Sequence, residues 1–167
     1  MSENFDLNLP GTIGAFQKSL FKILTREESV LDKRIPVLCE NQLDLLSKLE
    51  QSVAQSEPGI CVIIRTPTLV DTRMSGHLWF DDASVVFRIV ENVLLNRESG
   101  TKIPAQLAAE QVALSANVQV PDGCGAALIV YRISEVRDIT MKNILIYEVS
   151  AKTGVGLGSE PTPAEEE

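Results

Sequence analysis

Residues that could do chemistry are few in this chain of 167 residues. The single histidine, His77, lies in a long irregular segment beside Trp79, and we expect a solvated ring there rather than a metal site or a Ser/His/Asp triad. Asp81 and Asp82 could act as an acid and a base, but adjacent side chains on an extended chain point to opposite faces. We therefore interpret the two aspartates as a charged entrance to a strand.

The three cysteines, Cys39, Cys61 and Cys124, are an odd number without a short spacing between any two of them. Such a pattern predicts neither a zinc knuckle nor a disulfide framework. Cys61 stands in an apolar run and is expected to be a small buried hydrophobic residue. The sequence predicts no catalytic residue, no metal ligand and no cofactor, and we do not expect an enzyme.

One short segment carries a weak chemical signal. Residues 150–154 read Ser-Ala-Lys-Thr-Gly and resemble the guanine-contacting loop of small GTPases. These enzymes also need a phosphate-binding loop with the pattern Gly-x4-Gly-Lys-Ser/Thr. The nearest candidate, residues 11–19, has the wrong spacing, so nucleotide hydrolysis is not expected.

Three arginines, Arg65, Arg88 and Arg132, each interrupt a run of apolar residues. If their strands are neighbours, the arginines could form a row across the sheet, at a subunit contact where arginine is enriched. The acidic partners considered for such a row are Glu91, Glu135 and Glu148. The simpler interpretation, which we prefer, is that each arginine occupies the solvent face of its strand.

The spacing of apolar residues predicts three helices and several strands. The helices are expected from Ile13 to about residues 26–29, from about residue 43 to 53, and over residues 104–117, where the small residues Ala108 and Val112 would face a sheet. The strands are expected at residues 60–64, 85–90, 127–134 and 144–150, the last two as antiparallel neighbours. Residues 34–39 contain a proline and are expected to be an edge strand or an extended connection. Residues 67–82 are either a loop or an extended hairpin arm.

This order of elements indicates an α+β fold, with a mixed or mostly antiparallel sheet of about four to five strands and two to three helices packed on it. Residues 85–90 alternate between the two faces of a strand, and residues 60–64 form a continuous apolar run typical of a central strand. We divide the chain into a lead of residues 1–10, a single domain of residues 11–153, and a disordered acidic tail of residues 154–167.

The net charge of −8 arises partly from that tail, which holds four of the 23 acidic residues and no basic one. The rest of the chain has 19 acidic and 15 basic residues and is therefore also acidic. A protein that binds the phosphate backbone of nucleic acids usually has a basic surface. No stretch is apolar enough for a membrane helix, and the acidic first residues do not resemble a secretory signal. We expect a soluble intracellular protein that binds neither specific nucleic acid nor a membrane.

A resemblance to a known family rests on the order of these segments. An amphipathic first helix precedes the Ile-Pro-Val segment at residues 35–37, the Pro-Gly-introduced strand at residues 58–64, and the Val-Phe-Arg-Ile-Val strand at residues 86–90. A polar stretch at residues 90–101, an alanine-rich helix and a terminal hairpin follow. This order resembles the tail-terminator proteins of long-tailed bacteriophages and prophages, the family of minor tail protein U.

The resemblance implies a structural protein of a phage or phage-derived tail. Such a protein forms a ring, usually of six copies, that caps the tail tube and joins it to the head connector, although isolated subunits can be monomeric. It would occupy the bacterial cytoplasm during assembly and then the virion tail or a phage-like particle. The subunits would meet in head-to-tail contacts that close into a ring.

We expect the contact surfaces of such a subunit in residues 67–82 and 92–101. Long irregular segments in compact domains are usually functional or disordered, and the first of these segments is unusually apolar. The candidate contact residues are Leu69, Val70, Met74, Trp79, Asn96, Arg97 and Glu98. In the simpler alternative, Leu69 and Trp79 fold back onto the protein's own core.

A second hypothesis comes from a different class of protein. The chain could be a small α+β domain that binds a ligand or a peptide, and that could be an enzyme, with its pocket between residues 67–82 and the helix at residues 104–117. A cleft with convergent polar groups would favour this hypothesis. Exposed apolar rims would favour the tail protein.

Overall fold

The computed structural model describes residues 12–55, 58–74, 78–122, 124–137 and 142–158. The expected lead, residues 1–10, lies outside the described residues, as do His77 and residues 159–167 of the expected tail. The elements are α1 (Ile13–Thr25), β1 (Val37–Cys39), α2 (Leu45–Glu50), the π-helical turn η1 (Gln51–Gln55), β2 (Ile60–Ile64), β3 (Thr68–Val70), β4 (Trp79–Asn92), α3 (Val93–Glu98), α4 (Ala105–Ala116), β5 (Ile129–Val136) and β6 (Ile144–Gly156).

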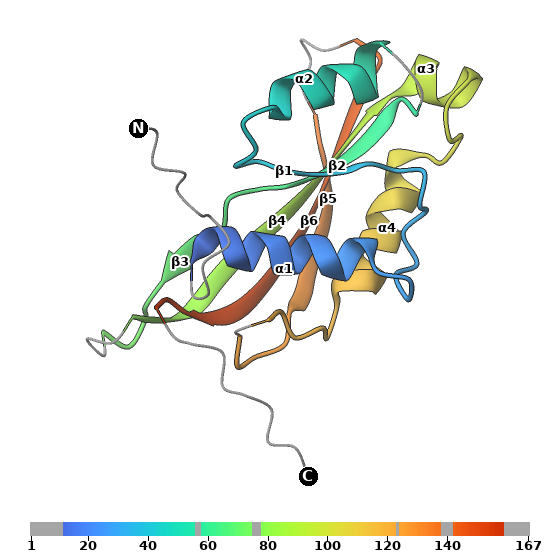
Figure 1. The fold of residues 1–167 in the computed structure, drawn as a ribbon. Coiled ribbons are helices and arrows are strands. Elements are labelled where there is room, and N and C mark those ends of the chain that lie inside the picture. Colours follow the sequence, from blue (N-terminus) through green and yellow to red (C-terminus); the bar gives the residue numbers. More distant parts are fainter. Residues whose placement is uncertain (1–11, 56–57, 75–77, 123, 138–141, 159–167) are drawn as a thin grey trace, which may run out of the picture.

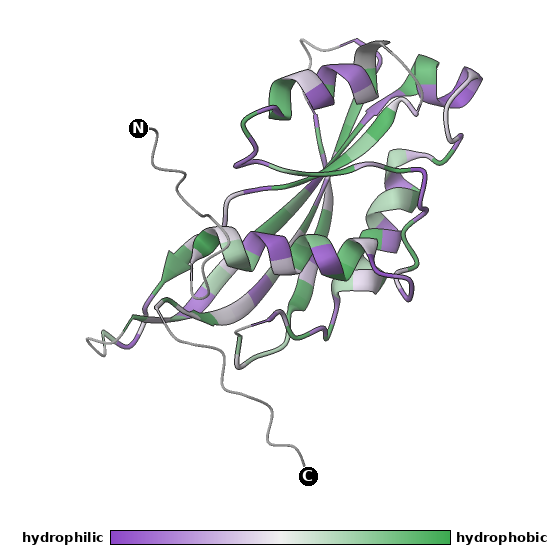
Figure 2. Ribbon diagram, viewed as in Figure 1, coloured by the Kyte–Doolittle hydropathy of each residue, from purple (hydrophilic) through white to green (hydrophobic). Residues whose placement is uncertain are grey.

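The strands form one sheet in the order β1-β2-β4-β6-β5, and the short strand β3 pairs with the first half of β4. Among the strands of the described residues, β1 and β2 are parallel, and the other four pairs are antiparallel. The expected α+β fold with a mostly antiparallel sheet is therefore confirmed. Helices pack against this sheet, and hydrophobic residues concentrate in its strands (Figures 1 and 2).

The centre of the sheet is the long antiparallel pair of β4 and β6. Their register runs from Trp79 opposite Gly156 to Asn92 opposite Ile144, with an irregularity between Phe80 and Ala83. The alternation predicted for residues 85–90 is confirmed, since Val85, Phe87 and Ile89 are fully buried. The strand is longer than predicted at both ends. The same alternation continues through the buried residues Ala83 and Glu91.

Strand β6 also extends beyond its predicted end at Ser150. Residues 150–154, which resemble a guanine-contacting loop, lie inside this strand and pair with β4. Gly154 and Val155 are buried strand residues. Assigning residues 154–156 to a disordered tail was therefore wrong, because the first half of β4 provides a backbone partner for them.

Helices α1 and α4 cover one face of the sheet and enclose the main hydrophobic core. In α4 the predicted small-residue face is confirmed, because Ala108 and Val112 are fully buried. This helix lies mainly over β4, β6 and β5, whereas α1 lies over β1 and β2. The Thr12 hydroxyl begins α1 by accepting a 3.0 Å hydrogen bond from the backbone N–H of Ala15.

The opposite face of the sheet is only partly covered. A small second core joins Leu38, Val53, Cys61 and Ile63, with Leu45 and Leu49 of α2 packed against it. The start predicted for this helix, at about residue 43, was wrong because α2 begins only at Leu45. It presents Leu45 and Leu49 to the sheet, whereas Leu43 and Leu46 are strongly exposed.

Candidate interaction surfaces

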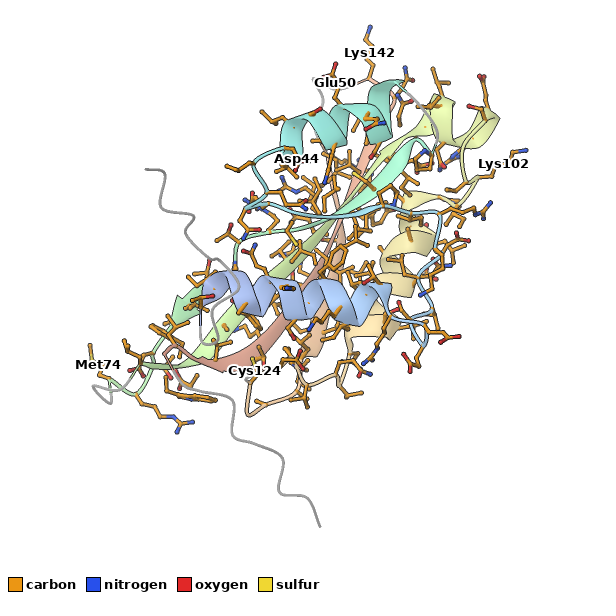
Figure 3. The ribbon with its side chains drawn as sticks, in the orientation of Figure 1. Asp44, Glu50, Met74, Lys102, Cys124 and Lys142 are labelled. Atoms are coloured by element: carbon orange, nitrogen blue, oxygen red, sulfur yellow. The ribbon has the colours of Figure 1, made fainter. Side chains whose placement is uncertain are left out.

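The described residues of the segment 67–82, which are 67–74 and 78–82, belong to a hairpin arm, one of the two structures expected for this segment. Strand β3 pairs with β4, with Thr68 opposite Ser84 and Val70 opposite Asp82. The arm projects from one end of the sheet beyond the helices, and Met74 lies at its outer end (Figures 1 and 3).

Two aspartates hold the described part of the turn between the strands of the arm. Asp71 Oδ1 accepts backbone hydrogen bonds from Arg73 (2.9 Å) and Met74 (3.1 Å). Asp81 accepts hydrogen bonds from the backbone N–H (2.8 Å) and the hydroxyl of Thr72, and Arg73 Nε lies 3.3 Å from its Oδ2. The hydrogen bonds from Thr72 are the main cause that lowers the pKa of Asp81, with a smaller contribution from the charge of Arg73.

The apolar residues of this segment separate into two groups. Leu69 packs against the main core, and the Trp79 ring lies over Gly154, where an added Cβ would stand 2.8 Å from the ring atom Cζ2. These two residues fold back onto the protein, as the simpler alternative predicted. Val70, Met74 and Leu78 are exposed, the last two by 90% and 65%. Among the described residues of the arm, these three form its solvent-facing apolar surface, which we call the arm tip.

Residues 92–101 are not the polar contact loop that we expected. Asn92 accepts a hydrogen bond from the backbone N–H of Leu95 and begins the short helix α3. Asn96 is fully buried, so its assignment as a contact residue was wrong. Arg97 and Glu98 remain on the surface of this helix.

Asn96 belongs instead to a buried polar network around Glu91. Its amide nitrogen donates to Glu91 Oε1 (2.9 Å) and to the carbonyl oxygen of Ile103 (2.8 Å), and its amide oxygen accepts from the Thr101 hydroxyl (2.8 Å). Glu91 Oε2 accepts a 2.8 Å hydrogen bond from the backbone N–H of Ala105, at the start of α4. This network fastens β4, α3 and α4 together and has a structural role.

The close packing around Asn96 also requires glycine at two positions. A Cβ on Gly59, which has a φ of +73°, would lie 2.5 Å from the backbone nitrogen of Asn96. A Cβ on Gly100 would lie 1.9 Å from the carbonyl oxygen of Pro58. Both distances are far below van der Waals contact, so a side chain at either glycine would force the backbone apart.

The three strand arginines do not form a single paired row. Arg88 Nε donates a 2.9 Å hydrogen bond to Glu148 on the neighbouring strand β6, and Arg65 Nε lies 3.5 Å from Glu40 Oε1. Arg132 is exposed on β5, opposite Ser150. Of the three proposed acidic partners, only Glu148 therefore pairs with one of these arginines. Glu91 pairs with Arg97, and Glu135 pairs with Arg137.

Strand β5 ends the sheet on the side away from β1. Three of its apolar residues, Ile129, Tyr131 and Ile133, are strongly exposed, and the ammonium group of Lys152 lies 5.7 Å from the centre of the Tyr131 ring. An edge strand offers backbone groups to a further strand. The β5 edge thus exposes apolar side chains on an element other than the arm, with Ile129 on the face of Lys152 and Ile133 on the face of Val149.

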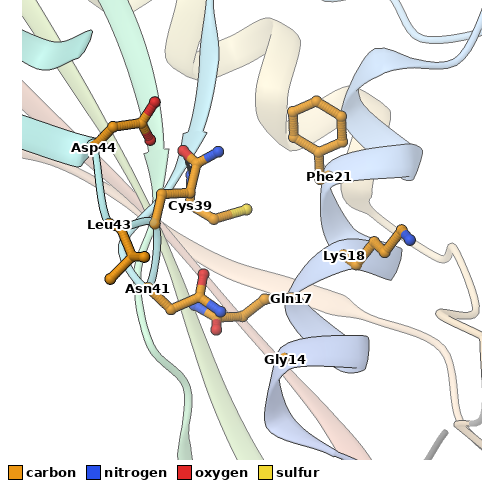
Figure 4. Close-up of a pocket in the computed structure, with 9 residues that line it drawn as sticks. Gly14, Gln17, Lys18, Phe21, Cys39, Asn41, Leu43 and Asp44 are labelled. Atoms are coloured by element: carbon orange, nitrogen blue, oxygen red, sulfur yellow. Dashed lines mark hydrogen bonds between the residues drawn. The ribbon is translucent and has the colours of Figure 1, made fainter. Parts of the chain in front are cut away.

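A groove with a volume of about 410 Å³ separates α1 from the segment that joins β1 to α2 (Figure 4). Gly14, Gln17, Lys18 and Phe21 line its α1 side, and Cys39, Asn41, Gln42, Leu43 and Asp44 line the other side. Burial raises the pKa of the Cys39 thiol, which disfavours the nucleophilic thiolate. The groove does not coincide with the pocket expected between residues 67–82 and α4.

Other candidate groups have structural partners. Asp81 bonds to Thr72, whereas Asp82 lies 3.2 Å from the Lys152 ammonium, so the two adjacent aspartates serve different contacts. Within the described ranges, no group of three or more His, Cys, Asp or Glu residues could hold a metal ion. The three cysteines are free thiols.

No protein-family model and no curated protein sequence matches the chain. Among the described residues, none of the helices has both the length and the apolar character needed to cross a membrane.

Proposed function

We propose that this protein is a structural subunit of a phage or phage-derived tail, which forms a ring that caps the tail tube and joins it to the connector. The observation that carries the proposal is the projecting arm. Val70, Met74 and Leu78 are exposed on it, away from the core. An exposed apolar group on a projecting element gains free energy when a partner surface removes it from water.

The arm tip and the β5 edge also suit a head-to-tail ring. A heterologous contact needs two different surfaces on each subunit, so that the same contact repeats around the ring. The arm belongs to β3 and β4, and the exposed apolar residues of the other surface belong to β5. In this proposal the arm tip of one subunit contacts the β5 edge of the next, and the closed ring caps the tail tube.

The alternative function is a small α+β domain that binds a ligand or a peptide. The groove beside α1 favours it, because apolar and polar side chains converge there. Cys39, the thiol among its lining residues, has a raised pKa, which disfavours attack by a thiolate in the groove.

The tail proposal is tested by a double substitution at the arm tip, Met74→Asp with Leu78→Asp, in the phage or prophage that encodes the protein. Both side chains are exposed, so circular dichroism should show an unchanged fold. We expect tails of irregular length in electron micrographs. Leu46→Asp, an equally exposed leucine on α2, is the matched control and should leave the tails uniform. Uniform tails from the double variant would contradict the role of the arm tip.

A further inference from the structure

The groove beside α1 contains a buried amide without a partner. Gln17 is 1% exposed, and its side-chain nitrogen has no hydrogen-bond partner among the described residues. Figure 4 shows this side chain extending from α1 toward Asn41 on the opposite wall. A buried amide without a partner is costly, so a group that brings a carbonyl oxygen into the groove would be favoured there.

The rest of the groove suits an extended peptide with apolar side chains. Leu43 on one wall is fully exposed, and Phe21 on the other wall is half-buried, so apolar surface on both sides remains in contact with water. Lys18 is exposed at the same groove and has no ion-pair partner among the described residues. An occupant with alternating apolar residues and a nearby negative charge would complement these groups.

The chain carries such a sequence immediately before α1. Residues 5–9 read Phe-Asp-Leu-Asn-Leu, so that Phe5, Leu7 and Leu9 alternate with Asp6 and Asn8. The apolar residues of an extended segment with this pattern lie on one side. The carboxylate of Asp6 would be the ion-pair partner of Lys18.

The position of this segment along the chain also fits the groove. Helix α1 begins at Ile13, and Gly14 in its first turn lines the groove. The chain therefore enters the helix at one end of the groove. The α1 side of the groove, from Gly14 to Phe21, is about 10 Å long at 1.5 Å per helical residue. Residues 5–9 would cover that length when extended. Pro10 and Gly11 suit the two central positions of a turn that reverses the chain.

We propose that residues 5–9 dock into the groove of their own chain, where a backbone carbonyl of the segment accepts a hydrogen bond from Gln17. Because only the four residues 10–13 separate the segment from Gly14 at the groove, its effective concentration there exceeds that of a second copy in dilute solution. The contact requires one copy of the chain only and is independent of tail assembly.

The test replaces Phe5 with the photoreactive residue p-benzoylphenylalanine in the full chain, followed by irradiation and peptide mapping. We expect an adduct of monomer mass that joins position 5 to residues 14–21 or 39–44. An adduct of dimer mass would assign the groove to a second copy. Either that result or an adduct outside the groove would overturn the proposal, and so would the absence of an adduct.

Two pairs of variants of the photoreactive chain test the contact itself. Leu7→Asp with Leu9→Asp should lower the adduct yield at least about fivefold, because it places two charges against apolar walls. Ser2→Asp with Asn8→Asp adds the same charge without removing an apolar side chain and should preserve the yield. On the groove side, Leu43→Glu should lower the yield, whereas Leu46→Glu on α2 should not. Equal yields within either pair would contradict docking through these apolar residues.

Discussion

The carboxylate of Glu91 accepts a 2.9 Å hydrogen bond from the side-chain amide of Asn96, and both side chains are fully buried. A carboxylate is expensive to remove from water unless hydrogen bonds and opposite charge compensate the loss. Here Asn96, the N–H of Ala105 and the guanidinium of Arg97 surround it. The position of α4 over the sheet is thereby coupled to the end of β4.

Replacing Asn96 with alanine should lower the free energy of unfolding by about 3 kcal/mol, because the substitution removes three buried hydrogen bonds. The Glu91 carboxylate loses one of its donors, the Thr101 hydroxyl loses its acceptor, and the Ile103 carbonyl loses the donor of the Asn96 amide. Urea denaturation monitored by circular dichroism measures the change. Glu98→Ala, at an exposed position on the same helix, is the control and should change the stability by less than about 0.5 kcal/mol. A change in N96A as small as that of the control would show that the network is not needed for stability.

Gly154→Ala should displace the indole ring of Trp79, because the new Cβ would lie 2.8 Å from Cζ2. Trp79 is the only tryptophan, so its fluorescence reports this site alone. We expect a red-shifted emission maximum and a loss of stability of roughly 1–3 kcal/mol from overpacking. Gly125→Ala is the control, since its Cβ would make an ordinary 3.4 Å contact with the same ring. An unshifted spectrum for G154A would mean that the ring does not lie over the strand.

Sequence reasoning predicted well those elements in which the order of apolar and polar residues indicates which side chains are buried. The alternation of Val85, Phe87 and Ile89 defines the two faces of β4, and the small residues of α4 show which side of that helix meets the sheet. Both patterns involve residues close together in the sequence. The burial of these segments follows from the pattern without knowledge of the partner strand.

The buried position of Asn96 was missed because it depends on contacts that span the chain, including the close approach of Gly59. One signal was present, since Glu91 continues the alternation of Val85, Phe87 and Ile89 on the buried face. A glutamate at a core position requires nearby donors, and Asn96 and Arg97 follow it within six residues. The short distance in sequence from Glu91 to these two donors could have indicated a buried hydrogen-bond network at residues 92–101, where we had predicted a contact loop.

Which apolar residues of the arm are exposed and which are packed could not be predicted from the segment alone, because the answer depends on a strand far away in the sequence. Trp79 and Met74 are both large apolar residues of one irregular segment, and only the pairing of β4 with β6 brings Gly154 beneath the first of them. The absence of a side chain at that glycine makes room for the ring. No local pattern around Trp79 contains this information, whereas Met74 is 90% exposed.

Cys124 should react slowly with iodoacetamide at neutral pH. Burial, with a smaller contribution from the charge of Asp122, raises the pKa of its thiol to about 11. At pH 8 the reactive thiolate is then roughly two orders of magnitude less populated than in free cysteine. The alkylation rate, measured by mass spectrometry of the Cys124 peptide, should rise about tenfold per pH unit between pH 8 and pH 10. A rate that levels off below pH 9 would contradict the raised pKa.

The turn at the arm tip should open in acid before the sheet unfolds. The hydrogen bonds from Thr72 and the charge of Arg73 lower the pKa of Asp81 in the folded protein, so its carboxylate stabilises the turn above the ordinary aspartate pKa of about 3.9. This stabilisation is lost as the pH falls through the lower pKa of the folded state. The protection of the Thr72 amide against hydrogen exchange, measured by NMR, should therefore decrease below about pH 3.9. Asp81→Asn should reduce that protection at every pH, while the amide of Ile89 at the centre of β4 should remain protected in both proteins. If the two amides of the unsubstituted protein lost protection together, the acid transition would be global unfolding and not the opening of the arm tip.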